Sequence, residues 1–120
     1  MASVLIVDDA IFTRMTIKRM LEAKGHSMVG EAATGVEAIE KFAELKPDVV
    51  ILDITMPGMN GVEALKRIKI LDPEAKVVIC SAVGLQNIIA QAIELGAEEF
   101  IIKPFDAEQL VAAVDKVMKR

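Results

Sequence analysis

The chain is poor in aromatic residues and has one cysteine and one histidine. Tryptophan and tyrosine are absent and only four phenylalanines occur in 120 residues, so the core must be aliphatic. The single Cys80 excludes an internal disulfide and agrees with a reducing compartment, which we take to be the cytoplasm. The only histidine, His26, follows a glycine and is expected to be exposed in a turn. A lone histidine in such a place disfavours a phosphohistidine relay role.

The charge pattern and the apolar runs exclude further classes. The net charge is −4 and no basic run is present, which disfavours nucleic acid as a partner. No apolar run approaches the roughly 20 residues that cross a membrane, and no signal peptide is visible. With 53% hydrophobic and 27% charged residues, the composition predicts a single globular domain over residues 1–120, expected to be a monomer.

Short β-branched runs alternate with amphipathic segments along the whole chain. The predicted strands are residues 3–7, 28–32, 49–52, 77–79 and 100–102, and the polar run 28–32 is placed at a sheet edge. Capping motifs begin helices at Thr34, Asn60 and Asp106, and Gly25 and Gly96 are expected at helix ends. This alternation predicts an α/β fold with a five-stranded parallel sheet and five helices on both faces.

Polar residues follow the apolar runs of four predicted strands. Asp8 and Asp9 end the first strand, Asp53 the third, Ser81 the fourth and Lys103 the fifth. Parallel strands bring these ends to one edge of the sheet, where ligands bind in open α/β folds. Three close carboxylates repel one another, and Mg²⁺, a hard cation that prefers oxygen ligands, relieves the repulsion. No histidine or cysteine is at these ends to favour zinc.

The same residue types suit transfer of a phosphoryl group. An aspartate carboxylate can attack phosphorus and form an acyl phosphate. Asp53 ends the central strand and is the best-placed acceptor. Mg²⁺ and the Lys103 ammonium would neutralise the transferred group, and the Ser81 hydroxyl would donate a hydrogen bond to one of its oxygens.

Four segments together resemble the receiver domain of two-component response regulators. They are Asp8-Asp9, residues 53–61, Ser81-Ala82 and residues 103–105, and the resemblance covers nearly the whole chain. It implies a flavodoxin-like, doubly wound fold with strand order 2-1-3-4-5. It also implies a cis bond before Pro104 and phosphorylation of Asp53. Asp9 and Asp53 would bind the metal directly, Asp8 largely through water, and Thr55 through its backbone carbonyl.

The resemblance further implies a switch. Ser81 and Lys103 would read the phosphoryl oxygens, and Phe100 occupies the position of the switch aromatic. A partner surface is expected on the fourth helix, fifth strand and fifth helix, with Ile88, Ile89 and Phe100 as candidate contacts. Core packing remains the alternative for the two isoleucines, because single exposed apolar residues are common.

Positions two after the acceptor and two after the serine tune the phosphoryl lifetime in the family. Here they are Thr55 and Val83, and neither is an acid or an amide that orients an attacking water. Slow to moderate self-hydrolysis is therefore expected.

The expected function is a stand-alone response regulator in control of chemotaxis. A chemotaxis-type histidine kinase would phosphorylate Asp53 with Mg²⁺, and the product would bind a motor-switch or adaptor protein of flagellar or archaellar rotation. The chain would be no enzyme beyond catalysing its own phosphorylation and dephosphorylation.

Three other functions are compatible with an α/β fold of this size. One is a single-domain receiver in another phosphorelay. A haloacid-dehalogenase-like phosphatase needs an Asp-x-Asp motif after the first strand, where this chain has Asp8-Asp9-Ala10. A flavodoxin-like flavin carrier needs a Ser/Thr-rich loop and aromatic residues, which this chain lacks.

Overall fold

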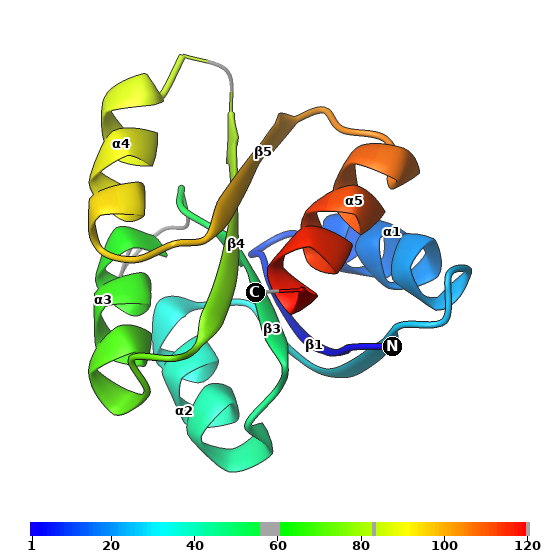
Figure 1. Ribbon diagram of the computed structural model, residues 1–120, viewed down its shortest axis with the longest axis horizontal. Coiled ribbons are helices and arrows are strands. Elements are labelled where there is room, and N and C mark those ends of the chain that lie inside the picture. The colour runs from blue at the N-terminus through cyan, green and yellow to red at the C-terminus, as the bar shows by residue number, and fades with distance from the viewer. Residues whose placement is uncertain (56–60, 83, 120) are drawn as a thin grey trace.

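Strands and helices alternate along the chain, as the sequence predicts (Figure 1). The computed structural model describes residues 1–55, 61–82 and 84–119. The strands are β1 (Ser3–Val7), β2 (Ser27–Ala32), β3 (Val49–Asp53), β4 (Lys76–Ala82) and β5 (Glu99–Lys103). The helices are α1 (Ile11–Glu22), α2 (Gly35–Leu45), α3 (Gly61–Leu71), α4 (Gln86–Glu94) and α5 (Ala107–Met118).

The strands form one parallel sheet in the order β2-β1-β3-β4-β5. This confirms the predicted fold class and strand order. From β1 the chain first adds β2 on one side of the sheet and then adds β3, β4 and β5 on the other side, so the strand order switches between β1 and β3. In sheets of this kind, ligands bind in the crevice outside the carboxyl ends of the two strands at the switch point.

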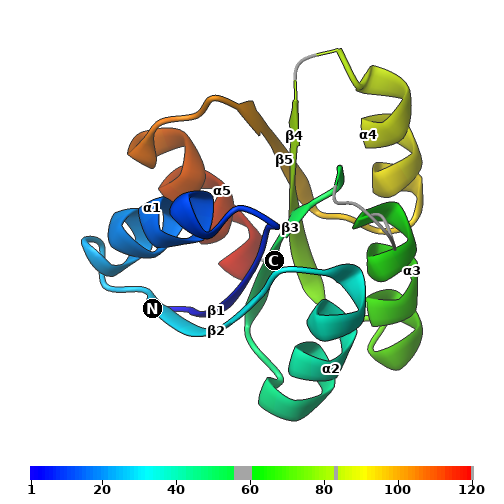
Figure 2. The ribbon, with the colours of Figure 1, turned by 180° about the vertical axis from the view of Figure 1, so that it is seen from behind.

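Helices cover both faces of the sheet and enclose two cores. Helices α1 and α5 lie on one face, and α2, α3 and α4 lie on the other (Figures 1 and 2). Alternate residues of a strand point to opposite faces. On β1, Val4 and Ile6 belong to the core beneath α1 and α5, and Leu5 and Val7 belong to the other core.

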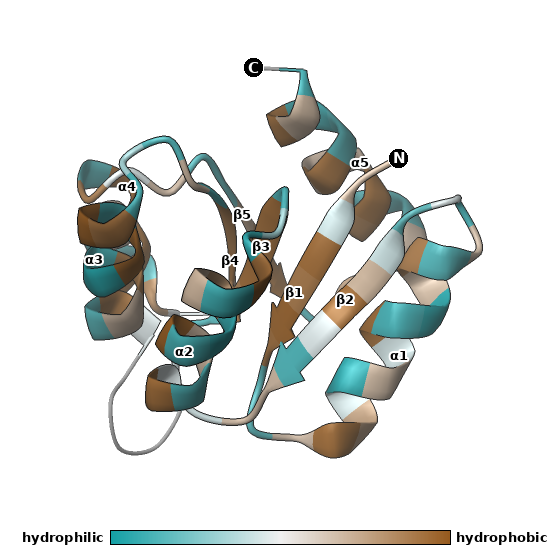
Figure 3. Ribbon diagram, turned by 90° about the horizontal axis from the view of Figure 1, so that it is seen from below, coloured by the Kyte–Doolittle hydropathy of each residue, from teal (hydrophilic) through white to brown (hydrophobic). Residues whose placement is uncertain are grey.

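The burial of each strand explains how apolar its sequence is. All five residues of β3 are buried, because helices cover both of its faces, and a strand of this kind needs apolar residues throughout. Strand β2 lies at the sheet edge, as predicted, and only Ala32 of it is buried. Its more polar character beside β1 is visible in Figure 3.

Two of the three predicted helix caps lie within the described residues. At the start of α5, Asp106 accepts from the Gln109 N–H at 2.8 Å, and the Gln109 side chain accepts from the Asp106 N–H at 3.0 Å, which confirms the capping box. At α2, Thr34 accepts from the Glu37 N–H at 3.1 Å, but the Glu37 carboxylate accepts from the residue before the cap. The predicted cap at Asn60 lies outside the described residues.

The prediction that His26 is exposed is wrong. The residue is 6% exposed, its Nδ1 accepts from the Ala2 N–H at 2.9 Å, and its Nε2 lies 3.0 Å from Asp115 Oδ1. Since Nδ1 accepts, the ring hydrogen lies on Nε2 and is donated to Asp115. The turn after α1 carries His26 into the gap between β1 and α5, which no local sequence pattern reveals.

Within the described ranges, none of the helices combines the length and the apolar character that a membrane crossing requires.

Candidate functional site

The polar residues predicted at the strand ends come together at the carboxyl edge of the sheet. Asp8 directly follows β1, Asp53 is the last residue of β3, and Lys103 is the last residue of β5. One carboxylate oxygen each from Asp8, Asp9 and Asp53 lies within 4.8 Å of the others. Lys103 Nζ lies 2.7 Å from Asp8 Oδ2 and 3.2 Å from Asp53 Oδ2. The ammonium thus joins two carboxylates that are 95 and 50 residues away in sequence.

Asp8 is almost completely buried and both of its carboxylate oxygens are occupied. Its Oδ1 accepts from the Ala10 N–H at 2.9 Å, closing a turn at the start of α1, and its Oδ2 accepts from Lys103. A buried charge held by this number of partners is costly to move. The expectation that Asp8 acts on the metal largely through water stays a prediction.

Asp53 is the central carboxylate of the site and is 3% exposed. Its Oδ1 accepts two hydrogen bonds from Thr55, one from the backbone N–H at 2.9 Å and one from the hydroxyl at 2.8 Å. Its Oδ2 accepts from Lys103. The two oxygens therefore differ, because Oδ1 is held by its own loop and Oδ2 accepts from the ammonium of a lysine on another strand.

The electrostatics of the site centre on Lys103. Burial alone would lower the pKa of this ammonium, but the hydrogen bond to Asp8 and the charges of Asp53 and Asp8 outweigh it and raise the pKa above the ordinary lysine value. Lys103 is therefore a fixed positive charge at neutral pH. It stands between the carboxylates where an anionic group would need compensation.

Asp9 is the exposed member of the cluster. Within residues 1–55, 61–82 and 84–119, no hydrogen bond or ion pair of its carboxylate is observed. Its oxygens are open to a ligand, and Asp53 and Asp8 stand beside it. Three carboxylates with one exposed member form a donor set of hard oxygens, which fits Mg²⁺ with several retained waters.

Ser81 lies fully buried on β4 beside the site. Its hydroxyl donates to the Ala82 carbonyl at 3.0 Å. The neighbouring Cys80 is also buried, as predicted, and desolvation raises the pKa of its thiol to about 12 against the opposing charge of Lys103. Cys80 therefore stays a neutral thiol and acts as a small core residue.

The three residues predicted for a partner surface differ in exposure. Phe100 is 41% exposed and Ile88 is half-buried. Ile89 is only 8% exposed and packs in the core, which favours the core-packing alternative for this residue. Helix α4 turns Ile89 toward the sheet, and the residue contributes only the floor of a hollow of about 350 Å³ that Phe100 borders. The exposed isoleucine of α4 is Ile93.

Two contacts at the site were missed by sequence reasoning. One is the hydrogen bond from the Thr55 hydroxyl to Asp53, since the Thr55 carbonyl was expected to bind the metal and its side chain to affect only the phosphoryl lifetime. The other is Arg14 on α1, which donates to the Asp8 carbonyl at 2.7 Å and pairs with Glu31 on β2 at 2.6 Å. A hydroxyl two residues after Asp53 was a readable signal. The Arg14–Glu31 pair spans 17 residues, and only the fold brings it together.

Two further predictions concern the loops. The bond between Lys103 and Pro104 is cis, as expected. Val83, one of the two positions expected to tune the phosphoryl lifetime, lies outside the described residues.

The comparisons with known proteins agree on one family. The family model of the response regulator receiver domain matches residues 4–115 of this chain. The chain is 52% identical over 116 residues to the chemotaxis protein CheY of Thermotoga maritima, covering 97% of both chains. It is 49% identical over 119 residues to the chemotaxis protein CheY of Listeria monocytogenes, covering 99% of this chain and 100% of that one. A crystal structure of the CheX–CheY–BeF3–Mg²⁺ complex from Borrelia burgdorferi matches with a TM-score of 0.92 and 36% identity, covering 96% of this chain and 87% of that chain.

Proposed function

The chain belongs to the response regulator receiver domain family, and from this premise we propose that it is a chemotaxis response regulator phosphorylated on Asp53. Receiver domains are signalling modules and not conventional enzymes. The observation that carries the proposal is the position of Asp53, a buried carboxylate that shares Lys103 with Asp8 and has a carboxylate oxygen within 4.8 Å of oxygens of Asp8 and Asp9. Structural packing does not require a buried acid at the end of a central strand.

The proposed reaction is attack by a carboxylate oxygen of Asp53 on the phosphorus of a phosphorylated histidine or of a small acyl phosphate. A new bond forms between oxygen and phosphorus, the bond from phosphorus to the donor breaks, and its electron pair leaves with the donor. The product is an acyl phosphate on Asp53. Because such transfers depend on position and charge compensation, the domain itself would supply most of the catalysis.

Lys103 would supply one part of the charge compensation. Its ammonium already contacts Asp53 Oδ2, and a small rotation of the side chain would bring it to an oxygen of the transferred group. Asp9 and Asp53, with the Thr55 carbonyl, would hold Mg²⁺, which supplies charge neutralisation at the phosphoryl oxygens when bound. Asp8 would stay hydrogen-bonded to Ala10 and act on the metal through water.

Ser81 and Phe100 would pass the signal on. The Ser81 hydroxyl would exchange its bond to the Ala82 carbonyl for one to a phosphoryl oxygen, which pulls the end of β4 toward Asp53. Phe100 stands on β5 opposite Ile79 of β4, and it is exposed in the present conformation, so the movement would allow it to repack. Its lack of a hydroxyl means that no tyrosine-type hydrogen bond assists this step.

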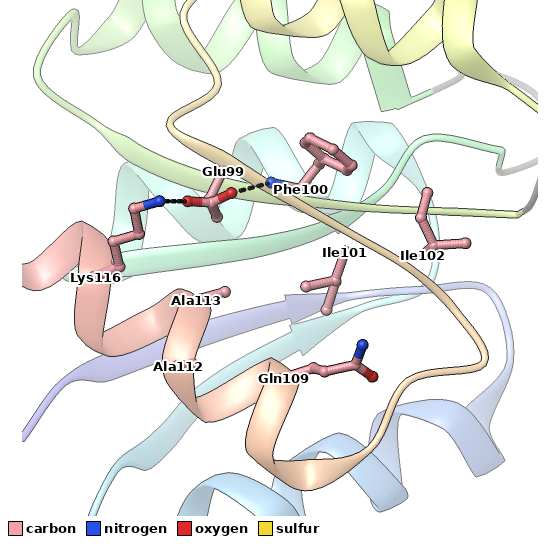
Figure 4. A pocket seen from close by; sticks show the side chains of 8 residues that line it. All are labelled: Glu99, Phe100, Ile101, Ile102, Gln109, Ala112, Ala113 and Lys116. Atoms are coloured by element: carbon pink, nitrogen blue, oxygen red, sulfur yellow. Dashed lines mark hydrogen bonds and ion pairs between the residues drawn. The ribbon is translucent and has the colours of Figure 1, made fainter.

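The proposed output is binding of a partner protein to the face of α4, β5 and α5. On β5, Phe100 and Ile101 point to opposite sides, and Ile101 faces α5 (Figure 4). A second hollow, of about 370 Å³, lies between β5 and α5, and Glu99 and Lys116, which pair at 3.0 Å, are among the residues that line it. Two relatives of about the same length are chemotaxis proteins, which supports a histidine kinase as the donor and a motor-switch or adaptor protein as the target.

The first test is incubation with acetyl phosphate and Mg²⁺ followed by intact mass measurement. We expect one phosphoryl adduct that is labile in alkali and absent when EDTA replaces Mg²⁺. Asp53→Asn should abolish the adduct, and Asp48→Asn, which changes an exposed aspartate far from the site, should not. An adduct of unchanged yield in Asp53→Asn would refute the proposed function.

A further inference from the structure

Arg14 connects the edge strand β2 to the backbone of the candidate metal site. It lies in the first turns of α1, and its side chain is only 12% exposed. Its Nε donates to Glu31 Oε1 at 2.6 Å, and its Nη1 donates to the Asp8 carbonyl at 2.7 Å. The two contacts use two different nitrogens of one rigid, planar group, so Glu31 fixes the direction in which Arg14 holds the carbonyl.

The held carbonyl belongs to the peptide that joins Asp8 to Asp9. This peptide is planar, so a hydrogen bond to its oxygen fixes the orientation of the whole unit and the direction in which the chain enters Asp9. The carboxylate of Asp8 closes its own turn onto the Ala10 N–H, and the Asp8 N–H donates to the Ala32 carbonyl at 3.0 Å. Asp9 has no comparable side-chain contact within the described parts of the chain. Its place beside Asp53 therefore depends on the backbone that carries it.

From these contacts the geometry points to Arg14 as a positioning residue for divalent metal binding, acting through the Asp8–Asp9 peptide and itself oriented by Glu31. The inference rests on the proposed metal site. Arg14 touches neither a reacting atom nor a predicted metal ligand side chain. It sets the position of the exposed ligand Asp9, and partners of this kind commonly change metal affinity about 10-fold or more when they are removed.

The charge of Arg14 and its positioning role predict opposite changes in Mg²⁺ affinity when the residue is removed. A positive group near a cation site weakens binding by repulsion, so removing it should strengthen Mg²⁺ binding if only charge matters. If Arg14 positions Asp9, removing it should weaken Mg²⁺ binding in spite of the lost repulsion. Arg14→Lys separates the two further, because it keeps the charge but cannot contact Glu31 and the Asp8 carbonyl in the same geometry.

The test is calorimetric titration of MgCl₂ into the unaltered protein and into Arg14→Ala, Arg14→Lys and the control Arg19→Ala. Arg19 lies on the same helix and is exposed, so its removal changes net charge equally. We expect both Arg14 variants to bind Mg²⁺ about 10-fold more weakly, and Arg19→Ala to bind within twofold of the unaltered protein. Thermal unfolding in Mg²⁺-free buffer identifies any variant that fails to fold, and in that case Arg14→Lys carries the test.

Variants of Glu31 provide a second, independent test of the positioning role. Glu31→Ala should also weaken Mg²⁺ binding, and the double variant Arg14→Ala/Glu31→Ala should bind no more weakly than Arg14→Ala alone, because Glu31 acts only through Arg14. At saturating Mg²⁺, the rate of phosphorylation by acetyl phosphate should return to that of the unaltered protein. A role confined to fold stability would lower the unfolding temperature and leave Mg²⁺ affinity unchanged.

The outcomes separate this inference from the proposed function. Unchanged or tighter Mg²⁺ binding by Arg14→Lys and Arg14→Ala, while the unaltered protein binds the metal, overturns the positioning role alone. Absence of Mg²⁺ binding by the unaltered protein overturns the metal site and this inference with it. Weaker Mg²⁺ binding by the Arg14 variants, together with a normal phosphorylation rate at saturating Mg²⁺, supports both the proposed function and the positioning role of Arg14.

Discussion

At the scale of single residues, three aspartates of the same chemistry lie in three different environments. Asp8 is buried with both oxygens occupied, Asp53 is buried with one oxygen held by its own loop and the other shared with Lys103, and Asp9 is exposed. Neighbours, and not residue type, set these differences. An acceptor that must be reactive is best held in place by partners that leave one face free.

The Thr55 hydroxyl is one such partner of Asp53, and its removal should be measurable. Thr55→Val keeps the shape and the backbone N–H but removes the 2.8 Å hydrogen bond to Oδ1. We expect a loss of about 1.5 kcal/mol in the free energy of unfolding, because the bond is made to a charged, buried group. Urea unfolding in Mg²⁺-free buffer measures this loss.

The double variant Asp53→Ala/Thr55→Val is the control for this assignment. In the Asp53→Ala background the valine should cost almost nothing, and Thr55→Ser should retain the stability of the unaltered protein. An equal loss in both backgrounds would mean that the hydroxyl acts elsewhere.

At the scale of elements, the junction of β3 and α3 is the tightest part of the site. Gly61, the first residue of α3, is buried, and a Cβ built on it would collide with the Asp53 carbonyl and the backbone of Ile54. The first residue of α3 therefore lies directly against the strand end that carries Asp53. This close approach explains a glycine inside the segment 53–61 that resembles receiver domains.

Gly61→Ala should accordingly destabilise the protein by about 3 kcal/mol, the upper range for inserting a methyl group into a packed site that cannot yield. Thermal or urea unfolding measures it. Gly84→Ala is a suitable comparison, because its φ of +93° carries a left-handed strain of about 1 kcal/mol but no atom lies within 4 Å of the added Cβ. Equal losses in the two variants would contradict the role of the close approach at Gly61.

At the scale of the whole molecule, contacts between distant segments hold the sheet from both edges. At the edge opposite the site, His26 links the start of β1 to α5, and Lys69 of α3 pairs with Glu98 before β5 at 2.9 Å. At the site edge, Lys103 links β5 to the ends of β1 and β3. The position of Asp53 is therefore a property of the assembled sheet.

Lys103→Ala tests this link through stability and signalling together. Removing the ammonium leaves Asp8 and Asp53 buried without their shared partner, and we expect a loss of about 3 kcal/mol in Mg²⁺-free buffer. Mg²⁺ should restore more stability than it adds to the unaltered protein, because no ammonium competes with the cation. Urea unfolding with and without MgCl₂ measures both effects.

The same variant should still accept a phosphoryl group but fail to change its partner binding. Without the Lys103 ammonium, no charged group on β5 contacts the phosphoryl group, so phosphorylation of Asp53 cannot shift β5. Phosphorylation-dependent binding of the partner that equals that of the unaltered protein would refute this role of the lysine.

The sequence by itself determined the fold class, the strand ends and the identity of the central site residues. Apolar runs of strand length, capping residues and the acids that close the runs are local signals, and each follows from the period of a strand or helix and from hydrogen bonds within a few residues. The same signals were enough for Asp8, Asp9, Asp53, Ser81 and Lys103, because parallel strands must end at a common edge.

Only the tertiary structure decided the contacts that join segments distant in sequence. The burial of His26, the burial of Ile89 and the bridge from Arg14 to Glu31 depend on which surfaces meet. A side chain's exposure and partners are set by the elements packed against it, and no period in the sequence encodes them. The sequence therefore placed the candidate site residues at one edge of the sheet, and the fold supplied the contacts that hold them in position.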